Sequence, residues 1–373
     1  MIHKSQRATS PFETGINLKP QKLKAGDTIA IVSLSSGILG EPFIKQQLDL
    51  GHRRLEAYGF NVKMMPNALR GLKYLSDHPE ARADDLIMAF QDVEVKAIVC
   101  AIGGEDGFRL APYLFENDAL CEAVTRHPKI FLGFSDTTVH HLMLANCRLR
   151  SFYGQAFLAD IAEHSTEMLP YSRQAFEDLF LQGKIDAIEP SSVWYEERHR
   201  YDDRQFGVDR VMHPDTKGYE LLRGPGKFKG QIFAACIESL SDIFSGTRYA
   251  EEPKIFEHYD IMPPAEFWAG KILLLESSEE KVSPDNLEVM LRVLNEKGFF
   301  DRITGLLIGK PQDEAFYEEY KQVYLDIITR EDLPIVYNIN VGHATPRAII
   351  PLWTLTDVDV EAQTITFLED VLL

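Results

Sequence analysis

Residues 129–137 read Lys-Ile-Phe-Leu-Gly-Phe-Ser-Asp-Thr, an apolar run that passes directly into a small polar turn. The run is short and ends at Gly133, as buried strands often do. Residues 137–146 then have the composition of a helix. The stretch therefore predicts a strand–turn–helix unit with Ser135 in the turn.

The same alternation extends toward the amino terminus. The apolar runs predicted as strands are 27–34, 60–64 and 95–102, and the segments with helical spacing are 42–58, 79–90 and 111–124. Continuous apolar strands that alternate with helices are typical of a parallel sheet covered on both faces. The first half of the chain is therefore predicted to be an α/β domain.

The second half repeats this pattern after a change in composition. Residues 188–217 are polar and aromatic without a clear period, which indicates a linker or a long loop. Strands are then expected at 271–275, 303–308 and 334–340, helices at 284–297 and 316–329, and an antiparallel ribbon over 348–358 and 364–367. We therefore expect an amino-terminal arm (1–22), a first domain (23–180), a linker (181–218) and a second domain (219–373).

Composition limits the classes of function. A chain of 373 residues with a formal net charge of −18 fits two soluble domains and argues against a nucleic-acid partner, because no basic cluster is visible. No apolar run reaches membrane-spanning length, and the first ten residues hold no signal-like core. The four cysteines lie far apart; Cys100 and Cys236 are expected to be buried thiols, and nothing requires an oxidising compartment. We expect a cytoplasmic protein without a membrane partner.

Ser135 has two interpretations. A serine between a strand and a helix amino terminus can act as a nucleophile, with free N–H groups facing a developing oxyanion. It can also be a simple helix cap, and capping serines greatly outnumber nucleophiles. The local sequence is not the GxSxG of α/β-hydrolases, since Thr137 stands where the second glycine would be.

The glycine-rich stretch 103–107, Gly-Gly-Glu-Asp-Gly, follows the strand that ends at Ile102. It can be a tight turn or a loop whose backbone approaches a ligand closely. A Walker-type phosphate loop is disfavoured because the Lys-Ser/Thr pair is missing. Its position on the strand expected beside Ser135 favours a role in an oxyanion hole.

Two further strand ends carry catalytic residue types. Glu276 ends the apolar run 270–275, and His343 lies in a loop fixed by Gly342 and Pro346. A carboxylate and an imidazole complete a Ser–His–acid triad, whose members can come from any chain order. Glu279 and Glu280 fit a solvated surface better, and the histidines lack the spacing of a metal site.

These stretches together resemble the LD-carboxypeptidase family of serine peptidases, which includes the microcin C immunity peptidase. The resemblance covers the chain from about residue 22 to its end. It rests on the order and spacing of these segments: 23–29, 82–86, 97–104, 133–136, 153–154, 236–240, 246–247, 273–276, 305–311 and 342–346.

The resemblance implies site residues and a fold. Ser135 would be the nucleophile, His343 the general base and Glu276 the carboxylate that orients it, and the amides of Gly104 and Asp136 would form the oxyanion hole. The implied fold is a Rossmann-like amino-terminal domain with a smaller α/β carboxy-terminal domain, and the site lies between them. Family members are typically cytoplasmic homodimers that need neither metal nor cofactor. Residues expected to bind substrate are Gly103, Glu105, Arg109 and Trp194.

The sequence departs from the family pattern at positions that can reshape the substrate pocket. Ala234-Ala235 replaces a usual Gly-Gly pair, and Trp353 replaces a common glycine. Arg109 is a candidate anchor for a carboxylate. The loop with Trp194, Tyr195 and Tyr201 lies where microcin-type relatives carry aromatic residues that stack on a nucleotide base, although aromatic loops are more often packing.

Two substrate classes stay open: an aminoacyl-nucleotide or similar peptide-like amide, which is favoured, and a murein tetrapeptide. A non-catalytic small-molecule binding module is the alternative of another class. A cysteine-dependent amidotransferase is disfavoured, because no cysteine occupies the turn at Ser135.

Overall fold

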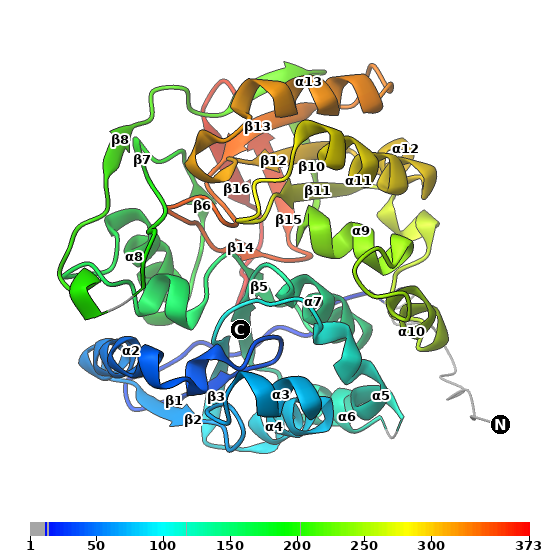
Figure 1. Cartoon of the computed structure of the whole chain (residues 1–373). Coiled ribbons are helices and arrows are strands. Elements are labelled where there is room, and N and C mark those ends of the chain that lie inside the picture. Colours follow the sequence, from blue (N-terminus) through cyan, green and yellow to red (C-terminus); the bar gives the residue numbers. More distant parts are fainter. Residues whose placement is uncertain (1–11, 13–14, 117, 202) are drawn as a thin grey trace.

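The computed structural model describes residue 12 and residues 15–116, 118–201 and 203–373. Its strands form two large sheets in two parts of the molecule, drawn one above the other in Figure 1. Both are mixed sheets with a run of parallel strands at the centre and helices packed around them. The predicted α/β class is confirmed.

The first sheet has the strand order β14-β5-β4-β3-β1-β2. Its strands are β1 (Thr28–Val32), β2 (Asn61–Met64), β3 (Val95–Cys100), β4 (Ile130–Gly133), β5 (Phe152–Tyr153) and β14 (Ile350–Pro351). All neighbours are parallel except β14, which pairs with β5 in the antiparallel sense. Its helices are α2 (Lys45–Ala57), α3 (Leu72–Asp77), α4 (Pro79–Gln91), α5 (Ala111–Phe115), α6 (Ala119–Arg126) and α7 (Thr137–Asn146).

One predicted helix of this part is divided. The segment 111–124 forms α5 and α6, and Asp118, which precedes α6, has a positive φ of 51° that a continuous helix does not allow. The strands β5 and β14 have only two residues each, which is too short for a hydrophobic period that would predict a strand from the sequence.

The second sheet has the order β6-β16-β15-β10-β11-β12-β13-β9. Its strands are β6 (Ala187–Ile188), β9 (Glu220–Arg223), β10 (Lys227–Cys236), β11 (Lys271–Glu276), β12 (Gly305–Gly309), β13 (Ile335–Ile339), β15 (Leu355–Asp359) and β16 (Thr364–Phe367). Strands β10 to β13 are parallel, whereas β15 and β16 form the expected antiparallel ribbon. Its helices are α9 (Ile237–Ser245), α10 (Glu252–His258), α11 (Pro284–Glu296), α12 (Phe299–Arg302) and α13 (Tyr317–Ile327).

The segment between the two sheets contains more regular secondary structure than an irregular linker would. Helix α8 (Pro170–Glu177) is followed by β6 of the second sheet and by an antiparallel pair, β7 (Val193–Tyr195) and β8 (Met212–Pro214). Short 3-10 turns lie at Ile38–Gly40, Pro42–Ile44, Gly107–Leu110, Asp203–Gln205, Ala265–Trp268 and Gln312–Glu314, and π turns at Phe157–Ile161 and Asp178–Gln182. The residues predicted as an irregular linker thus include three strands.

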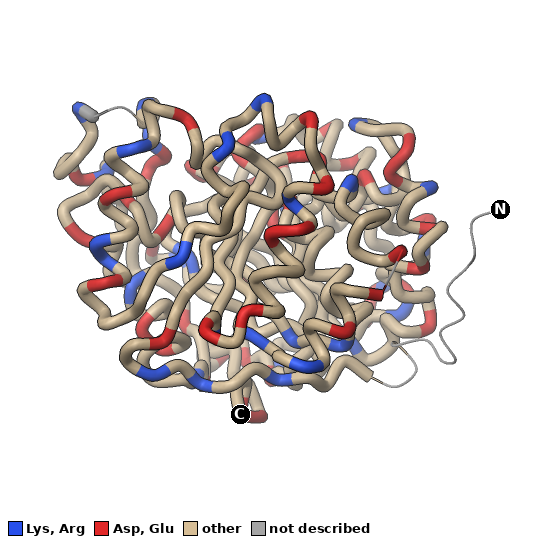
Figure 2. Tube along the Cα trace, turned by 90° about the horizontal axis from the view of Figure 1, so that it is seen from below, with Lys and Arg blue, Asp and Glu red and all other residues tan. Residues whose placement is uncertain are grey.

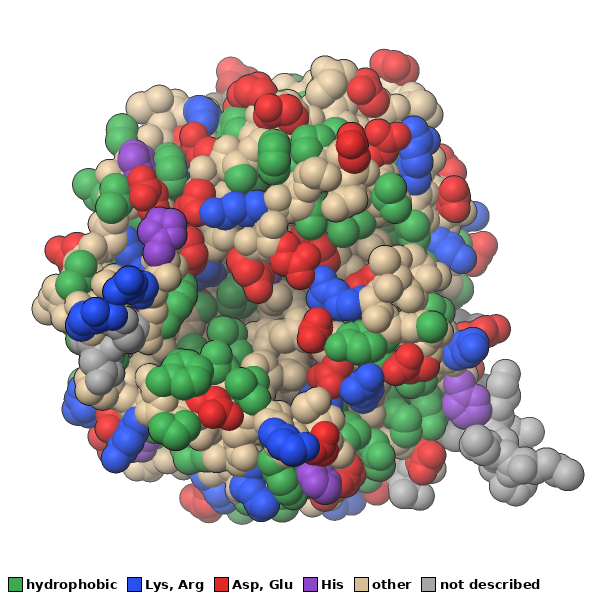
Figure 3. Space-filling view, viewed as in Figure 1, with side chains coloured by type: hydrophobic (Ala, Val, Ile, Leu, Met, Phe, Trp, Pro, Cys, Tyr) green, Lys and Arg blue, Asp and Glu red, His purple; other side chains and the backbone are tan. Residues whose placement is uncertain are grey.

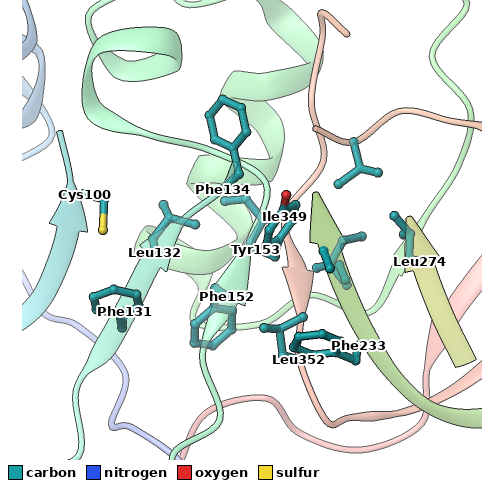
Figure 4. Close-up of a cluster of buried hydrophobic side chains, with 14 of the residues drawn as sticks. Cys100, Phe131, Leu132, Phe134, Phe152, Tyr153, Phe233, Leu274, Ile349 and Leu352 are labelled. Carbon is teal, nitrogen blue, oxygen red and sulfur yellow. The ribbon is translucent and has the colours of Figure 1, made fainter. Parts of the chain in front are cut away.

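One continuous hydrophobic core joins the two sheets. Figure 4 shows Leu132 and Phe152 of the first sheet on one side and Phe233 and Leu274 of the second on the other, with Leu352 between them. Phe233 also stacks on Trp353, with ring centroids 4.6 Å apart. This shared packing fixes the ends of one set of parallel strands against those of the other.

Cys121 and Cys147 form a disulfide with their Cα atoms 4.7 Å apart, whereas Cys100 and Cys236 are buried thiols as expected. The bond joins α6 to the residue after α7. Disulfides are uncommon in reducing compartments, so this pairing does not favour the expected cytoplasmic location, which stays a prediction.

The distribution of charged residues and the character of the helices describe the outside of the molecule. In the view of Figure 2, Asp and Glu lie all around the chain trace, interspersed with Lys and Arg. Within the described ranges, no helix combines the length and apolar character needed to cross a bilayer.

Candidate active site

Three strand ends converge between the two sheets. Ser135 follows β4, Glu276 is the last residue of β11, and His343 lies four residues after β13. Because the carboxyl ends of neighbouring parallel strands meet at one edge of a sheet, this edge is where open α/β sheets usually bind ligands. The three residues predicted as a triad therefore occupy the expected position.

Their side chains form one hydrogen-bonded chain. The Oγ atom of Ser135 lies 3.1 Å from Nε2 of His343, and Nδ1 of His343 lies 2.7 Å from Oε2 of Glu276. Glu276 is 1% exposed and His343 is 7% exposed. This is the connectivity of a nucleophile, a base and an orienting carboxylate.

The backbone at Ser135 has the form of a nucleophile elbow. Its φ is 65°, which is rare for a residue with a side chain, and α7 begins two residues later. A Cβ on Gly103 would lie 2.6 Å from the Cβ of Ser135, so the neighbouring strand end must carry a glycine. The Ser135 hydroxyl contacts His343, and Asp136 occupies the cap position of α7, so a simple capping role for Ser135 does not fit.

Glu276 is held in place by tight packing. Tyr153 donates a hydrogen bond of 2.6 Å to Oε1, and the backbone N–H of His343 donates to Oε2 at 3.2 Å. A Cβ on Gly342, which has a φ of 82°, would lie 2.3 Å from the Glu276 side chain. Only glycine therefore allows the histidine loop to approach the carboxylate this closely.

Tyr153 connects the acid to the nucleophile. Its hydroxyl also accepts the backbone N–H of Ser135 at 3.1 Å. Figure 4 shows this side chain between the two sheets, on the strand β5 that continues the first sheet. In the sequence, Tyr153 belongs to a segment that resembles the family (153–154), but nothing there indicates its role. That role follows from its hydrogen bonds to Glu276 of the second sheet and to Ser135 of the first.

Arg347 holds the loop of His343 through the backbone carbonyl groups of that loop. Its guanidinium donates to the carbonyl oxygens of Gly342 and His343, the latter at 3.0 Å, and pairs with Asp160 at 3.1 Å. All of these groups are buried or nearly so. The sequence alone did not single out Arg347, because its ion-pair partner Asp160 lies 187 positions away in the chain.

Nε2 of His343 has a second partner. The carboxylate oxygen Oε2 of Glu279 lies 2.9 Å from this nitrogen. Glu279 is exposed, as expected of a solvated surface residue, but its contact with the candidate base was not predicted. Burial lowers the pKa of His343, but the charges of Glu276 and Glu279 outweigh it and raise the pKa to about 10.

The expected oxyanion donors lie beside Ser135. The backbone N–H groups of Gly104 and Asp136 donate to no acceptor within the described part of the chain. The Asp136 side chain turns inward and accepts the N–H of Gly107 at 3.0 Å, which ties the glycine-rich loop to the turn at Ser135. Both amides are thus available to a ligand.

A cavity of about 680 Å³ opens at Ser135. The hollow is visible between the two parts of the molecule in Figure 3, bordered by both acidic and basic side chains. Its charged lining residues are Lys73, Glu105, Asp106, Arg109, Glu238, Arg248, Glu279 and Glu280. The volume fits a ligand of small-peptide or nucleotide size.

The residues expected to bind substrate are not all at this cavity. Glu105 and Arg109 line it, and Arg109 pairs with Asp106 at 3.4 Å and with Glu251 at 3.3 Å. Gly103 packs behind Ser135. Trp194 is not one of the lining residues: it stacks on His213, with ring centroids 4.3 Å apart.

Trp194 is nevertheless tied to the site through its neighbour. The N–H of Tyr195 donates to Thr345 in the histidine loop at 2.9 Å. The strand that carries Trp194 is therefore fixed to the loop that carries His343.

One group of metal-ligand types occurs at the site. Single ligand atoms of Cys236, Glu276 and His343 lie within 4.8 Å of one another. Burial raises the pKa of the Cys236 thiol well above its usual value, and both Glu276 oxygens already accept hydrogen bonds. This donor set is poorly suited to a cation, because a thiol binds metals as the thiolate.

Models of two domains match most of this chain. The LD-carboxypeptidase N-terminal domain matches residues 29–154, and the LD-carboxypeptidase C-terminal domain matches residues 229–358. The chain belongs to the LD-carboxypeptidase family. The predicted family is confirmed, and membership supports a peptidase-type function.

Solved and curated relatives agree with this assignment. An MccF-like protein from Streptococcus pneumoniae, solved in complex with AMP, is 51% identical, with coverage of 92% of this chain and 98% of that chain and a TM-score of 0.89. A Bacillus subtilis protein named "Probable murein peptide carboxypeptidase" is 25% identical over 90% of each chain. The microcin C7 self-immunity protein MccF of Escherichia coli is 22% identical, covering 94% of this chain and 95% of its own.

Proposed function

We propose that this LD-carboxypeptidase family member is a serine-type amide hydrolase whose catalytic triad is Ser135, His343 and Glu276. The single observation that carries the proposal is the hydrogen-bonded chain from the Ser135 hydroxyl through both nitrogens of His343 to the buried Glu276. A hydroxyl, an imidazole and a carboxylate in this order perform acyl transfer on unrelated folds.

The reaction proceeds through an acyl-enzyme. Nε2 of His343 takes the hydroxyl proton as Ser135 Oγ attacks the amide carbon, and the carbonyl oxygen becomes an anion held by the amides of Gly104 and Asp136. The C–N bond then breaks, and His343 passes its proton to the leaving nitrogen. Water repeats the sequence: His343 takes a proton from the water as it attacks the ester, and Ser135 leaves with that proton. The net change is amide plus water to acid plus amine.

An aminoacyl-nucleotide or a related peptide-like amide is the substrate class that we favour. The 51% identical relative was solved in complex with AMP. The cavity also holds three cationic side chains, Lys73, Arg109 and Arg248, which suit a ligand with a phosphate or carboxylate group. Trp194 does not line the cavity at Ser135, and a contact between it and the substrate stays a prediction.

A murein tetrapeptide is the second candidate. The Bacillus subtilis relative, at 25% identity, carries a murein peptide carboxypeptidase name. Arg109 is then the expected anchor for the terminal carboxylate, since it lines the cavity and is a third exposed. A homodimer in the cytoplasm is expected for either substrate and stays a prediction.

A parallel turnover assay separates these candidates. Purified enzyme is incubated with a murein tetrapeptide and with an aminoacyl-adenylate mimic, and the released amine is measured by mass spectrometry. We expect faster cleavage of the mimic, and its loss in Ser135→Ala. Faster tetrapeptide cleavage would reverse the order of the candidates, and cleavage of either substrate by Ser135→Ala at the normal rate would exclude the triad.

A further inference from the structure

Two groups compete for one nitrogen of His343. The Ser135 hydroxyl lies 3.1 Å from Nε2, and the Glu279 carboxylate lies 2.9 Å from the same atom. An ionised carboxylate is repelled by the lone pair of an unprotonated ring nitrogen, so this close approach is favourable when Nε2 carries a hydrogen. An Nε2 that carries a hydrogen has no lone pair to take the serine proton.

Glu279 is placed to leave this position. It lies three residues after Glu276, in the turn that follows β11, and its side chain is 65% exposed. Glu276, in contrast, is 1% exposed and is fixed by Tyr153. The two carboxylates on His343 thus differ in mobility: one is built into the core and the other lies at the edge of the cavity.

We propose, on the basis of the triad proposed above, that Glu279 is a latch: in the free enzyme its carboxylate holds Nε2 of His343, and the imidazole becomes a base only when an incoming substrate displaces it. The leaving nitrogen of a substrate must approach Nε2 to receive its proton, so it claims the same space as Glu279. Arg248, which lines the same cavity and pairs with Asp242 and Glu280, also attracts the Glu279 carboxylate and favours its position at the cavity edge once released.

The charges around His343 make the latch effective. Glu276 and Glu279 face its two nitrogens, the Cys236 thiol lies nearby on β10, and the Arg347 guanidinium contacts its carbonyl oxygen. Tyr153 touches Glu276 from β5, and the Phe134 ring packs edge-on against the imidazole at 5.0 Å. The two carboxylates dominate this set and raise the pKa of His343 to about 10, so the latched imidazole is charged at neutral pH.

The test uses full-length enzyme and a fluorophosphonate probe. In this reaction Ser135 Oγ forms a bond to phosphorus, fluoride leaves, and His343 takes the hydroxyl proton. Labelling rates are measured from about pH 6 to about pH 10.5 for wild type, Glu279→Gln and Asp285→Asn. Asp285→Asn is the matched control, because it removes one negative charge from an exposed residue six positions away that does not line the cavity.

The expected signature is a shift of the pH profile. Without the Glu279 charge the pKa of His343 falls, so a larger fraction of the imidazole is neutral at pH 6.5 and can act as a base. Glu279→Gln should therefore label about tenfold faster at pH 6.5 for each pH unit by which this pKa falls. Above about pH 10 it should be no faster than wild type, because the imidazole is then a weaker base. Asp285→Asn should stay within about twofold of wild type throughout. A Glu279→Gln profile that superimposes on the wild-type profile overturns the latch.

A second measurement separates the latch from the triad. NMR follows the His343 imidazole signal, assigned by its loss in His343→Gln, through a pH titration of wild type and Glu279→Gln. A lower pKa in Glu279→Gln supports the latch even if no variant is labelled, in which case the proposed function fails. Labelling that depends on Ser135, with an unchanged His343 titration, keeps the triad and removes the latch.

Discussion

The hydroxyl of Ser135 lies 3.1 Å from Nε2 of His343, although the two residues are 208 positions apart in the chain. The first follows a strand of one sheet and the second follows a strand of the other. Their contact exists because a shared hydrophobic core fixes the two sets of strand ends against each other. The geometry of the site therefore depends on packing far from the reacting atoms.

Tyr153→Phe should slow hydrolysis about tenfold to a hundredfold. The hydroxyl satisfies Oε1 of Glu276 and accepts the N–H of Ser135, and an unsatisfied buried oxygen costs about 1–3 kcal/mol. Steady-state kinetics should show the loss mainly in kcat. Tyr171→Phe, which removes a hydroxyl that binds the backbone oxygen of Glu189, is the matched control. Equal rates for the two variants would contradict a positioning role for Tyr153.

Gly104→Ala should lower kcat by roughly 10²–10³, the effect of losing one oxyanion donor. A Cβ there would lie 2.9 Å from the backbone carbonyl carbon of Ser35, so the loop must shift and carry its N–H away. Gly226→Ala, where the nearest atom to a new Cβ is 3.5 Å away, should leave kcat unchanged. Retention of wild-type kcat by Gly104→Ala would remove Gly104 from the oxyanion hole.

Arg347→Met should lower the free energy of unfolding by about 3–5 kcal/mol, since it leaves the buried carboxylate of Asp160 without its partner. Urea unfolding at neutral pH measures this loss. The double variant Arg347→Met with Asp160→Asn should recover part of the stability, because no buried charge is then left unpaired. If the double variant is less stable than Arg347→Met, the ion pair is not the cause.

Glu252→Gln should stabilise the fold increasingly as the pH rises. Burial and the nearby Asp136 raise the pKa of Glu252 from its usual 4.5 to about 9. The unfolded chain therefore releases this proton from about pH 4.5 upward while the folded chain holds it, which costs up to ~1.4 kcal/mol per pH unit until about pH 9. Urea unfolding at pH 4 and pH 8 measures the difference between Glu252→Gln and wild type.

Glu257→Gln, an exposed carboxylate on the same helix, is the control for that experiment. It should show no pH-dependent gain. A gain for Glu252→Gln that is the same at pH 4 and pH 8 would mean that Glu252 titrates normally in the folded protein.

Local sequence predicted the parts of this protein that depend on continuous patterns. Strand β4 is an uninterrupted apolar run and β3 is apolar apart from the exposed Lys96, so both their position and the turn residues after them could be predicted. Ser135, Glu276 and His343 could be singled out because each follows such a run. Their joint geometry also needed the order of the strands, which the resemblance to a family implied.

The unpredicted features depend on contacts between distant segments. Strands β5 and β14 are too short to show a period, and β14 comes from the carboxy-terminal part of the chain to pair with β5. Glu279 stands in a charged stretch that is typical of solvated turns, and only the fold brings it to Nε2 of His343. The Cys121–Cys147 bond likewise depends on how α6 and α7 pack, which cysteine spacing does not encode.

The most direct test of the triad is intact-protein mass spectrometry after reaction with a fluorophosphonate. The account predicts one adduct on the wild-type chain, located on Ser135 by peptide mapping, no adduct in Ser135→Ala and severely reduced labelling in His343→Gln. Undiminished labelling of Ser135→Ala, or an adduct mapped to another residue, would contradict it.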